Sequence, residues 1–176
     1  MPLGDDSAVI VRPARPGDVD AICAQTTAVQ ALHAAARPDM FRPAGPDTFP
    51  PARVRELLAA PDRLFLVADA DGAVVGHAYA EEQRKPATPY RHAVARLYVN
   101  QMAVAEGHRG RGIGTRLLAA LRDAARAQGL DGVALDVYAF NAAARRFYER
   151  AGLAPERVYL ADALGPGPAG GSAGAV

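Results

Sequence analysis

The sequence predicts an α+β fold, in which helices cover a sheet formed by one chain of 176 residues. Alternating apolar and polar residues over 64–68 and 74–82, separated by Asp71-Gly72, indicate an antiparallel hairpin. Apolar residues at helical spacing occur before and after this hairpin. Half of all residues are apolar, enough for one hydrophobic core, so we expect a single domain over residues 1–163.

The other elements follow from local patterns. Asp18 is a candidate cap for a helix that Pro38 ends, and Gly129 and Gly152 are candidate C-caps of two later helices. Asn100-Gln101 interrupts a long strand pattern and predicts a bulge there. Further strands are predicted at 8–12, 93–104, 133–137 and 157–160, and helices at 18–37, around 54–58, at 113–128 and at 141–151.

Composition excludes several classes of protein. The formal charge is +1, so no overall charge attracts nucleic acid or an anionic membrane. No apolar stretch has membrane-spanning length, and Met1–Asp6 lacks the basic and apolar regions of a secretory signal, so we expect a soluble cytoplasmic protein. Cys23 is the only cysteine, so no internal disulfide can form. The glycine- and proline-rich tail, 164–176, is expected to be disordered.

A glycine-rich stretch joins the strand pattern ending at Val104 to the next helix pattern. Glycines let backbone N–H groups turn toward one point, and a helix N-terminus adds partial positive charge to them. Two arginines in the same stretch add full charges. The sequence therefore predicts a phosphate-binding loop formed by Arg109, Gly110, Arg111, Gly112, Ile113, Gly114 and Thr115.

Two motifs resemble those of the GCN5-related N-acetyltransferase (GNAT) superfamily. Residues 109–114, Arg-Gly-Arg-Gly-Ile-Gly, match its Arg/Gln-x-x-Gly-x-Gly/Ala motif, and residues 141–152 match its Asn-x-x-Ala-x-x-Phe-Tyr-x-x-x-Gly pattern. The resemblance covers residues 8–160. It implies α/β/α layers with about four helices flanking a mixed, mostly antiparallel sheet of about six to seven strands, whose fourth and fifth strands are splayed.

The resemblance also implies roles for particular residues. Acetyl-CoA would be the co-substrate, with its pyrophosphate on the amides of residues 109–115 and its pantetheine arm along Met102, Ala103 and Val104. Asn141 matches the position whose side chain contacts this arm, although it would also cap its helix in any fold. Tyr148 matches the residue that protonates the departing thiolate, although a buried structural tyrosine is the alternative. The usual arrangement of the family is a homodimer.

The general base is not assigned by the resemblance. Many relatives place a glutamate near position 100, where this chain has Asn100, and an amide cannot serve as a base. Glu81 and Glu82 are candidates, directly or through water, and an amine that is already deprotonated is a further alternative. The four histidines show no ligand spacing, so we expect no metal site.

The sequence thus predicts an acetyl-CoA-dependent N-acetyltransferase that acts on a primary amine of a small molecule or peptide. A non-catalytic acyl-CoA-binding sensor or scaffold of the same fold is the alternative, because the strand carboxylate is missing. A dinucleotide site built from the three glycines and Asp136 fits less well, since the spacing is Gly-x-Gly-x-Gly. The loops at 35–51 and 83–91, expected around the acceptor, carry no motif that names it.

Overall fold

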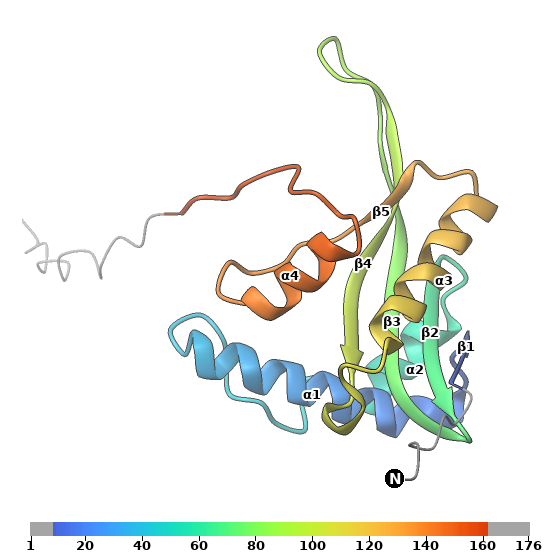
Figure 1. Ribbon diagram of the computed structural model, residues 1–176, viewed down its shortest axis with the longest axis vertical. Helices are drawn as coiled ribbons and strands as arrows, with labels where there is room; N and C mark the ends of the chain where they lie inside the picture. The colour runs from blue at the N-terminus through green and yellow to red at the C-terminus, as the bar shows by residue number, and fades with distance from the viewer. Residues whose placement is uncertain (1–8, 162–176) are drawn as a thin grey trace, which may run out of the picture. The chain divides into compact units, whose positions relative to one another are not determined.

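The computed structural model describes residues 9–161, which divide after Phe140 into two compact units. The predicted tail at 164–176 lies outside the described residues. The first unit contains β1 (Ile10–Pro13), the 3-10 turn η1 (Pro16–Asp18), α1 (Val19–Ala36), α2 (Pro51–Ala59), β2 (Arg63–Ala70), β3 (Ala73–Lys85), β4 (Val94–Val104), the 3-10 turn η2 (Glu106–His108), α3 (Ile113–Ala127) and β5 (Gly132–Ala134) (Figure 1). The second unit contains α4 (Ala142–Arg150).

The strands form one sheet in the order β1-β2-β3-β4-β5, antiparallel except for the parallel pair of β4 and β5. This confirms the mixed, mostly antiparallel sheet, and the four expected helices are present. The expected number of strands is too high, because residues 9–161 contain five. The strand predicted at 157–160 does not form; its Tyr159 is 85% exposed. β-branched and aromatic residues such as Val158 and Tyr159 favour extended backbone, but a strand also needs a neighbour for its hydrogen bonds.

Two strand ends also differ from the prediction. β3 continues to Lys85, so the polar loop expected from residue 83 begins later, and β5 ends at Ala134 instead of Val137. Residues 83–85 pair with residues 94–96 of β4, and this hairpin extends beyond the rest of the sheet (Figure 1). Main-chain pairing in a hairpin does not require apolar side chains, which explains why hydropathy did not indicate it.

Helices cover both faces of the sheet in the first unit. α1 and α2 pack on one face, where a buried cluster joins them to β2 and β3; its members are Val19, Ile22, Val54, Leu57, Phe65, Val67 and Tyr79. α3 packs on the other face. A Cβ added to Gly76 of β3 would lie 3.2 Å from Ile113 Cγ2 and 3.3 Å from Leu117 Cδ1. Glycine at this position therefore lets α3 approach β3 closely, which places the start of α3 beside the sheet.

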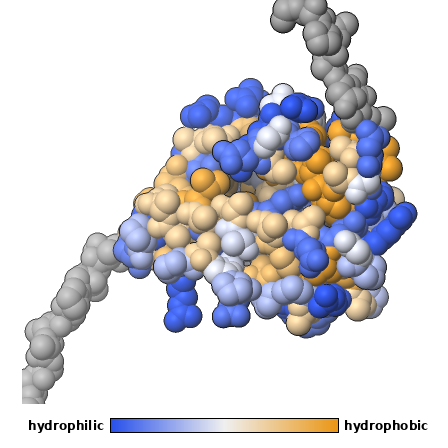
Figure 2. All heavy atoms as spheres, turned by 90° about the horizontal axis from the view of Figure 1, so that it is seen from below, coloured by the Kyte–Doolittle hydropathy of each residue, from blue (hydrophilic) through white to orange (hydrophobic). Residues whose placement is uncertain are grey.

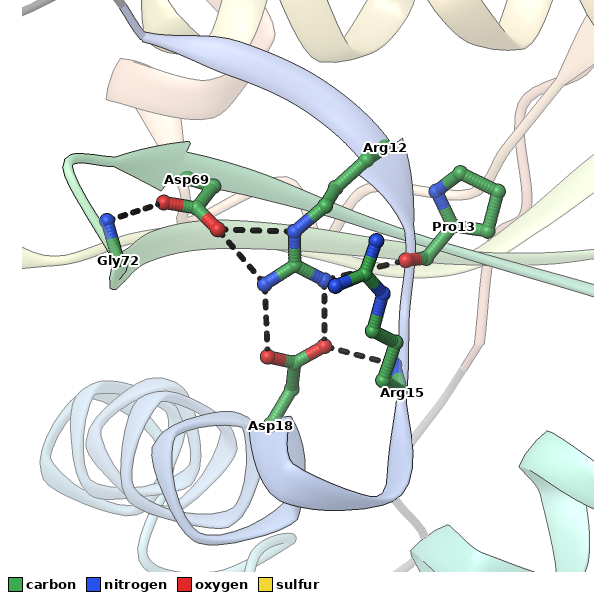
Figure 3. Close-up of polar contacts among 6 residues, drawn as sticks. All are labelled: Arg12, Pro13, Arg15, Asp18, Asp69 and Gly72. Atoms are coloured by element: carbon green, nitrogen blue, oxygen red, sulfur yellow. Dashed lines mark hydrogen bonds and ion pairs between the residues drawn. The ribbon is translucent and has the colours of Figure 1, made fainter.

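Arg12 on β1 joins two carboxylates from other parts of the first unit (Figure 3). Its Nη1 lies 2.8 Å from Oδ2 of Asp18, and its Nε lies 2.8 Å from Oδ2 of Asp69 on β2. Asp18 also accepts a bond from the amide of Arg15, and Asp69 accepts one from the amide of Gly72. Hydrogen bonding to Arg12 is the main reason that the pKa of each carboxyl group is lowered. These bonds tie the start of α1 to the β2–β3 hairpin.

Figure 2 shows hydrophilic and hydrophobic residues interspersed over the face seen from below. No helix within residues 9–161 combines the length and the apolar character needed to cross a membrane. Some large apolar side chains are nevertheless exposed. Met40, which is 53% exposed, lies in the loop after α1, and Tyr138, which is 47% exposed, lies in the segment after β5.

Candidate functional site

Two left-handed backbone positions shape the glycine-rich loop. Gly110 has a φ of 77° and Gly112 a φ of 76°, a region in which residues with a Cβ are strained. Gly114 lies in the first turn of α3, outside that region, so two of the three glycines are needed for the turn. A Cβ added at Gly110 or Gly112 would meet no atom within 4 Å. The space beside these two residues is therefore open.

The first turn of α3 leaves backbone donors beside this space. Arg116 closes the turn by donating to the carbonyl of Gly112 at 3.1 Å. The amides of residues 113–115 precede that bond, so no carbonyl of the helix accepts from them. Within the described part of the chain, no side chain caps this helix start either. Arg109 and Arg111 are exposed next to these amides. The arrangement suits a ligand with several negatively charged oxygens, such as a diphosphate.

β4 has an open edge next to the loop. β4 and β5 pair only over residues 96–98 and 132–134. Beyond those residues the two strands separate, and among residues 9–161 no strand pairs with residues 99–104 on that side. The structure thus confirms the splayed fourth and fifth strands. Such an edge offers unpaired main-chain N–H and C=O groups to a ligand that can lie along it.

The direction of each peptide group decides which residues of β4 present their N–H and C=O groups at the open edge. The amide of Ala105 donates to a carbonyl of β3 at 2.9 Å. Because successive residues of a strand point their N–H and C=O groups to opposite sides, those of Val104 and Met102 point to the open edge. Those of Ala103 point toward β3. Met102 and Val104 are therefore the two residues of the predicted trio whose main-chain groups could bind a ligand arm.

The predicted bulge lies at the far end of the open edge. Tyr79 pairs with Gln101 and Ala80 pairs with Val99, so Asn100 has no opposite residue on β3. This confirms the irregularity that the sequence indicates at Asn100-Gln101. At the near end, Nε of Arg109 donates to the carbonyl of Val104 at 3.2 Å, which links the glycine-rich loop to β4.

The second unit carries Asn141 and Tyr148. Oδ1 of Asn141 accepts a bond from the amide of Ala144 at 3.1 Å, so Asn141 caps α4 as expected from its residue type. The ring of Tyr148 lies edge-to-face against Phe147, with centroids 5.1 Å apart. Burial raises the pKa of the Tyr148 phenol to about 12. The phenol therefore keeps its proton throughout the neutral pH range.

The two candidate bases each contact an arginine. Glu81 on β3 forms an ion pair with Arg63 of β2, and Glu82 forms one with Arg84. Both carboxylates thus have an arginine partner, and the structure does not favour either of them as the general base.

The sequence did not indicate a buried polar group around His77 of β3. His77 is 1% exposed, and its Nδ1 lies 2.8 Å from Oε1 of Gln25 on α1. Its Nε2 lies 3.5 Å from Oγ1 of Thr26, which in turn donates to Gln101 beside the bulge at 3.4 Å. Burial lowers the pKa of His77 to about 4, so the ring is neutral at pH 7. These contacts join residues more than 50 positions apart, and no local pattern reveals them.

The free energy of unfolding is expected to fall as the pH drops from 6.5 to about 4 because of His77. In this range the unfolded chain binds a proton at His77 and the folded chain does not, so acid favours unfolding. The difference of about 2.5 pK units corresponds to roughly 3 kcal/mol. Urea denaturation at several pH values would measure it. In His77→Gln the free energy of unfolding should no longer show this dependence on pH, whereas the exposed control His92→Gln should keep it. An equal pH dependence in all three proteins would show that His77 is not its source.

Comparison with known proteins agrees with this geometry. The profile of the Acetyltransferase (GNAT) family matches residues 29–153, so the chain belongs to that family. Members of the family transfer an acyl group from acetyl-CoA. The resemblance stated from the two motifs is therefore confirmed.

Individual relatives resemble parts of the chain. Streptothricin acetyltransferase of Streptomyces lavendulae is 37% identical over 54% of this chain and 46% of its own length. The probable N-acetyltransferase camello of Xenopus tropicalis is 34% identical over 57% of this chain and 42% of its own. The chain thus spans less than half the length of both relatives. A tetramutant of the BH1408 protein from Bacillus halodurans is similar in structure, with a TM-score of 0.83 and 27% identity over 88% of this chain and 99% of that one.

Proposed function

We propose that this protein is an N-acetyltransferase that moves the acetyl group of acetyl-CoA to a primary amine of a small molecule or peptide. The observation that carries the proposal is the pair of left-handed glycines, Gly110 and Gly112, placed before uncapped amides of α3 and beside the open edge of β4. The proposal also includes a homodimer, the usual arrangement of the family.

The proposed cofactor site follows from these groups. The pyrophosphate would accept hydrogen bonds from the amides of the loop and of the first turn of α3, with Arg109 and Arg111 supplying charge. The pantetheine arm would lie along β4 and use the main-chain groups of Met102 and Val104. A backbone amide on this edge would donate to the thioester carbonyl and stabilise the oxyanion that forms during attack.

The reaction moves protons at two atoms. The nitrogen of an ammonium must lose one proton before it can attack the thioester and a second as the amide forms, and the departing sulfur must gain one. On the motif that it matches, Tyr148 is proposed to donate a hydrogen bond to that sulfur. Asn141 is proposed to contact the cofactor arm in addition to capping α4.

One relative favours a small molecule over a peptide as the proposed acceptor. The relative from Streptomyces lavendulae is named for the acetylation of streptothricin, and its similarity supports a small-molecule amine as the acceptor. Proteins of one fold can nevertheless act on unrelated acceptors, so the residues of the site decide which class of acceptor binds.

Acetyl-CoA and CoA are expected to raise the melting temperature of the protein. A ligand that binds only the folded state stabilises it by about 2.7 kcal/mol at a concentration of 100 times its dissociation constant. Differential scanning fluorimetry with acetyl-CoA, CoA and NAD would test the site, with NAD as the control. Stabilisation by NAD alone would favour the dinucleotide site.

The same protein should release CoA when amines are added to it with acetyl-CoA. A thiol-reactive dye detects the free thiol that this reaction produces. Binding of acetyl-CoA without CoA release, over a broad panel of amines, would favour the sensor or scaffold.

A further inference from the structure

Tyr98 and Asp136 meet where β4 and β5 separate. Tyr98 and Ala134 form the last pair between the two strands, and the chain after Ala134 leaves the sheet. The hydroxyl of Tyr98 donates to Oδ2 of Asp136 at 2.7 Å. This bond holds an exposed carboxylate at the point where the open edge of β4 ends.

The side chain of Tyr98 lies on the face of the sheet that α1 covers. Tyr98 is opposite Glu81 of β3, and directly opposite residues of an antiparallel pair point to the same face. Glu81 is two and four residues from Tyr79 and His77, which contact the α1 side. The carboxylate of Asp136, which accepts the hydrogen bond of Tyr98, therefore lies toward the face of the sheet that α1 covers.

An aromatic cluster lies farther along the segment that carries Asp136. It consists of His33 from α1, Phe41 from the following loop, and Tyr138 and Phe140 from the segment after β5. His33 stacks on Phe41 with centroids 5.0 Å apart, Tyr138 stacks on Phe140 at 5.4 Å, and Phe41 meets Tyr138 edge-to-face at 5.0 Å. Burial lowers the pKa of His33, so the cluster is uncharged at neutral pH.

The chemistry of this surface favours a particular kind of ligand. An exposed carboxylate attracts a cation, and the aromatic rings farther along the same segment favour both carbon chains and cations. A negative charge next to an ammonium favours the protonated form of that ammonium. An ion pair with Asp136 would keep the reacting nitrogen protonated and unable to attack. The cation that Asp136 binds must therefore be a second group of the acceptor.

We infer that the acceptor carries two amino groups, one of which reacts while the other binds as an ammonium to Asp136 beside the aromatic cluster. Tyr98 is a positioning residue that orients this carboxylate. This inference rests on the proposed function, because it assumes that the thioester lies along the open edge of β4. The reacting ammonium loses one proton to solvent, its nitrogen forms the bond to the acyl carbon and then gives up a second proton, the carbon–sulfur bond breaks, and the thiolate takes up one proton, so that one proton is released overall.

The test compares 1,4-diaminobutane with n-butylamine, which has the same carbon chain but one amino group. The native protein should acetylate the diamine with a kcat/KM at least tenfold higher than that of the monoamine. Asp136→Asn should remove most of this preference, because it should lower the kcat/KM for the diamine at least tenfold more than the kcat/KM for the monoamine. Tyr98→Phe should reduce the preference partly. Asp123→Asn, which removes the same charge from the exposed surface of α3, should preserve it.

A binding measurement provides a second readout. Calorimetry with 1,4-diaminobutane added to the protein saturated with CoA should show binding that Asp136→Asn weakens at least tenfold. An equal loss for both amines in Asp136→Asn, or a native preference for the monoamine, would overturn the inference and leave the acetyltransferase proposal in place. Absence of turnover with both amines despite acetyl-CoA binding would overturn the inference, and absence of turnover over the broad panel of amines would overturn the acetyltransferase proposal as well.

Discussion

Gly112→Val is expected to weaken acetyl-CoA binding by about a hundredfold or more, equivalent to roughly 2.7 kcal/mol. Gly112 has a φ of 76°, and a β-branched residue is strongly disfavoured there. The backbone would leave this conformation, and the amides of residues 113–115 would no longer face one point. The new side chain would also enter the open space beside the loop, where the pyrophosphate is proposed to lie. Calorimetry with CoA measures the loss directly.

Two further variants separate the effect of backbone strain from the effect of a side chain in the phosphate space. Asparagine tolerates the left-handed region, so Gly112→Asn should keep the loop conformation and most of the stability while still blocking the phosphate. Gly107→Val is the matched control, because Gly107 also faces open space but has no positive φ. Native affinity in Gly112→Asn would show that backbone strain alone explains the loss in Gly112→Val. Native affinity in Gly112→Val itself would place the phosphate elsewhere.

Local features of the structure follow closely from the sequence. Gly129 and Gly152 both have positive φ and follow α3 and α4, where the amides of Leu130 and Leu153 donate to carbonyls five residues earlier. Such caps depend on neighbouring residues, so the sequence reveals them. The bulge at Asn100 was equally visible, because an amide residue interrupts an otherwise alternating strand.

Contacts between distant residues were not predictable in the same way. Arg12 and Asp69 are 57 positions apart, and Tyr98 and Asp136 are 38 apart. Each pair consists of common residue types whose sequence neighbours give no sign of the partner. Their meeting depends on strand order and register, which the sequence pattern does not specify. The strand predicted at 157–160 does not form for a related reason: its residue types favour extended backbone, but among residues 9–161 no strand pairs with it.

Tyr148→Phe is expected to slow turnover by roughly tenfold to a thousandfold, as for the loss of one general acid, while acetyl-CoA affinity changes little. Burial raises the pKa of Tyr148 to about 12, above the value near 8.5 of an ordinary thiol. Complete transfer of the phenolic proton to the thiolate is therefore uphill, by about 5 kcal/mol for 3.5 pK units. The stabilisation must come mainly from a hydrogen bond that strengthens as charge develops on sulfur.

The raised pKa of Tyr148 predicts how the turnover rate depends on pH. Because the phenol stays protonated to well above pH 10, the native rate should show no loss from Tyr148 ionisation between pH 6 and pH 9. The ratio of the native rate to the Tyr148→Phe rate should therefore be constant over that range. Steady-state kinetics on both proteins and on Tyr159→Phe, an 85% exposed tyrosine, measure this ratio. An unchanged kcat in Tyr148→Phe would make this residue part of the packing around α4, and a ratio that falls with pH would mean that its proton is lost earlier than its burial implies.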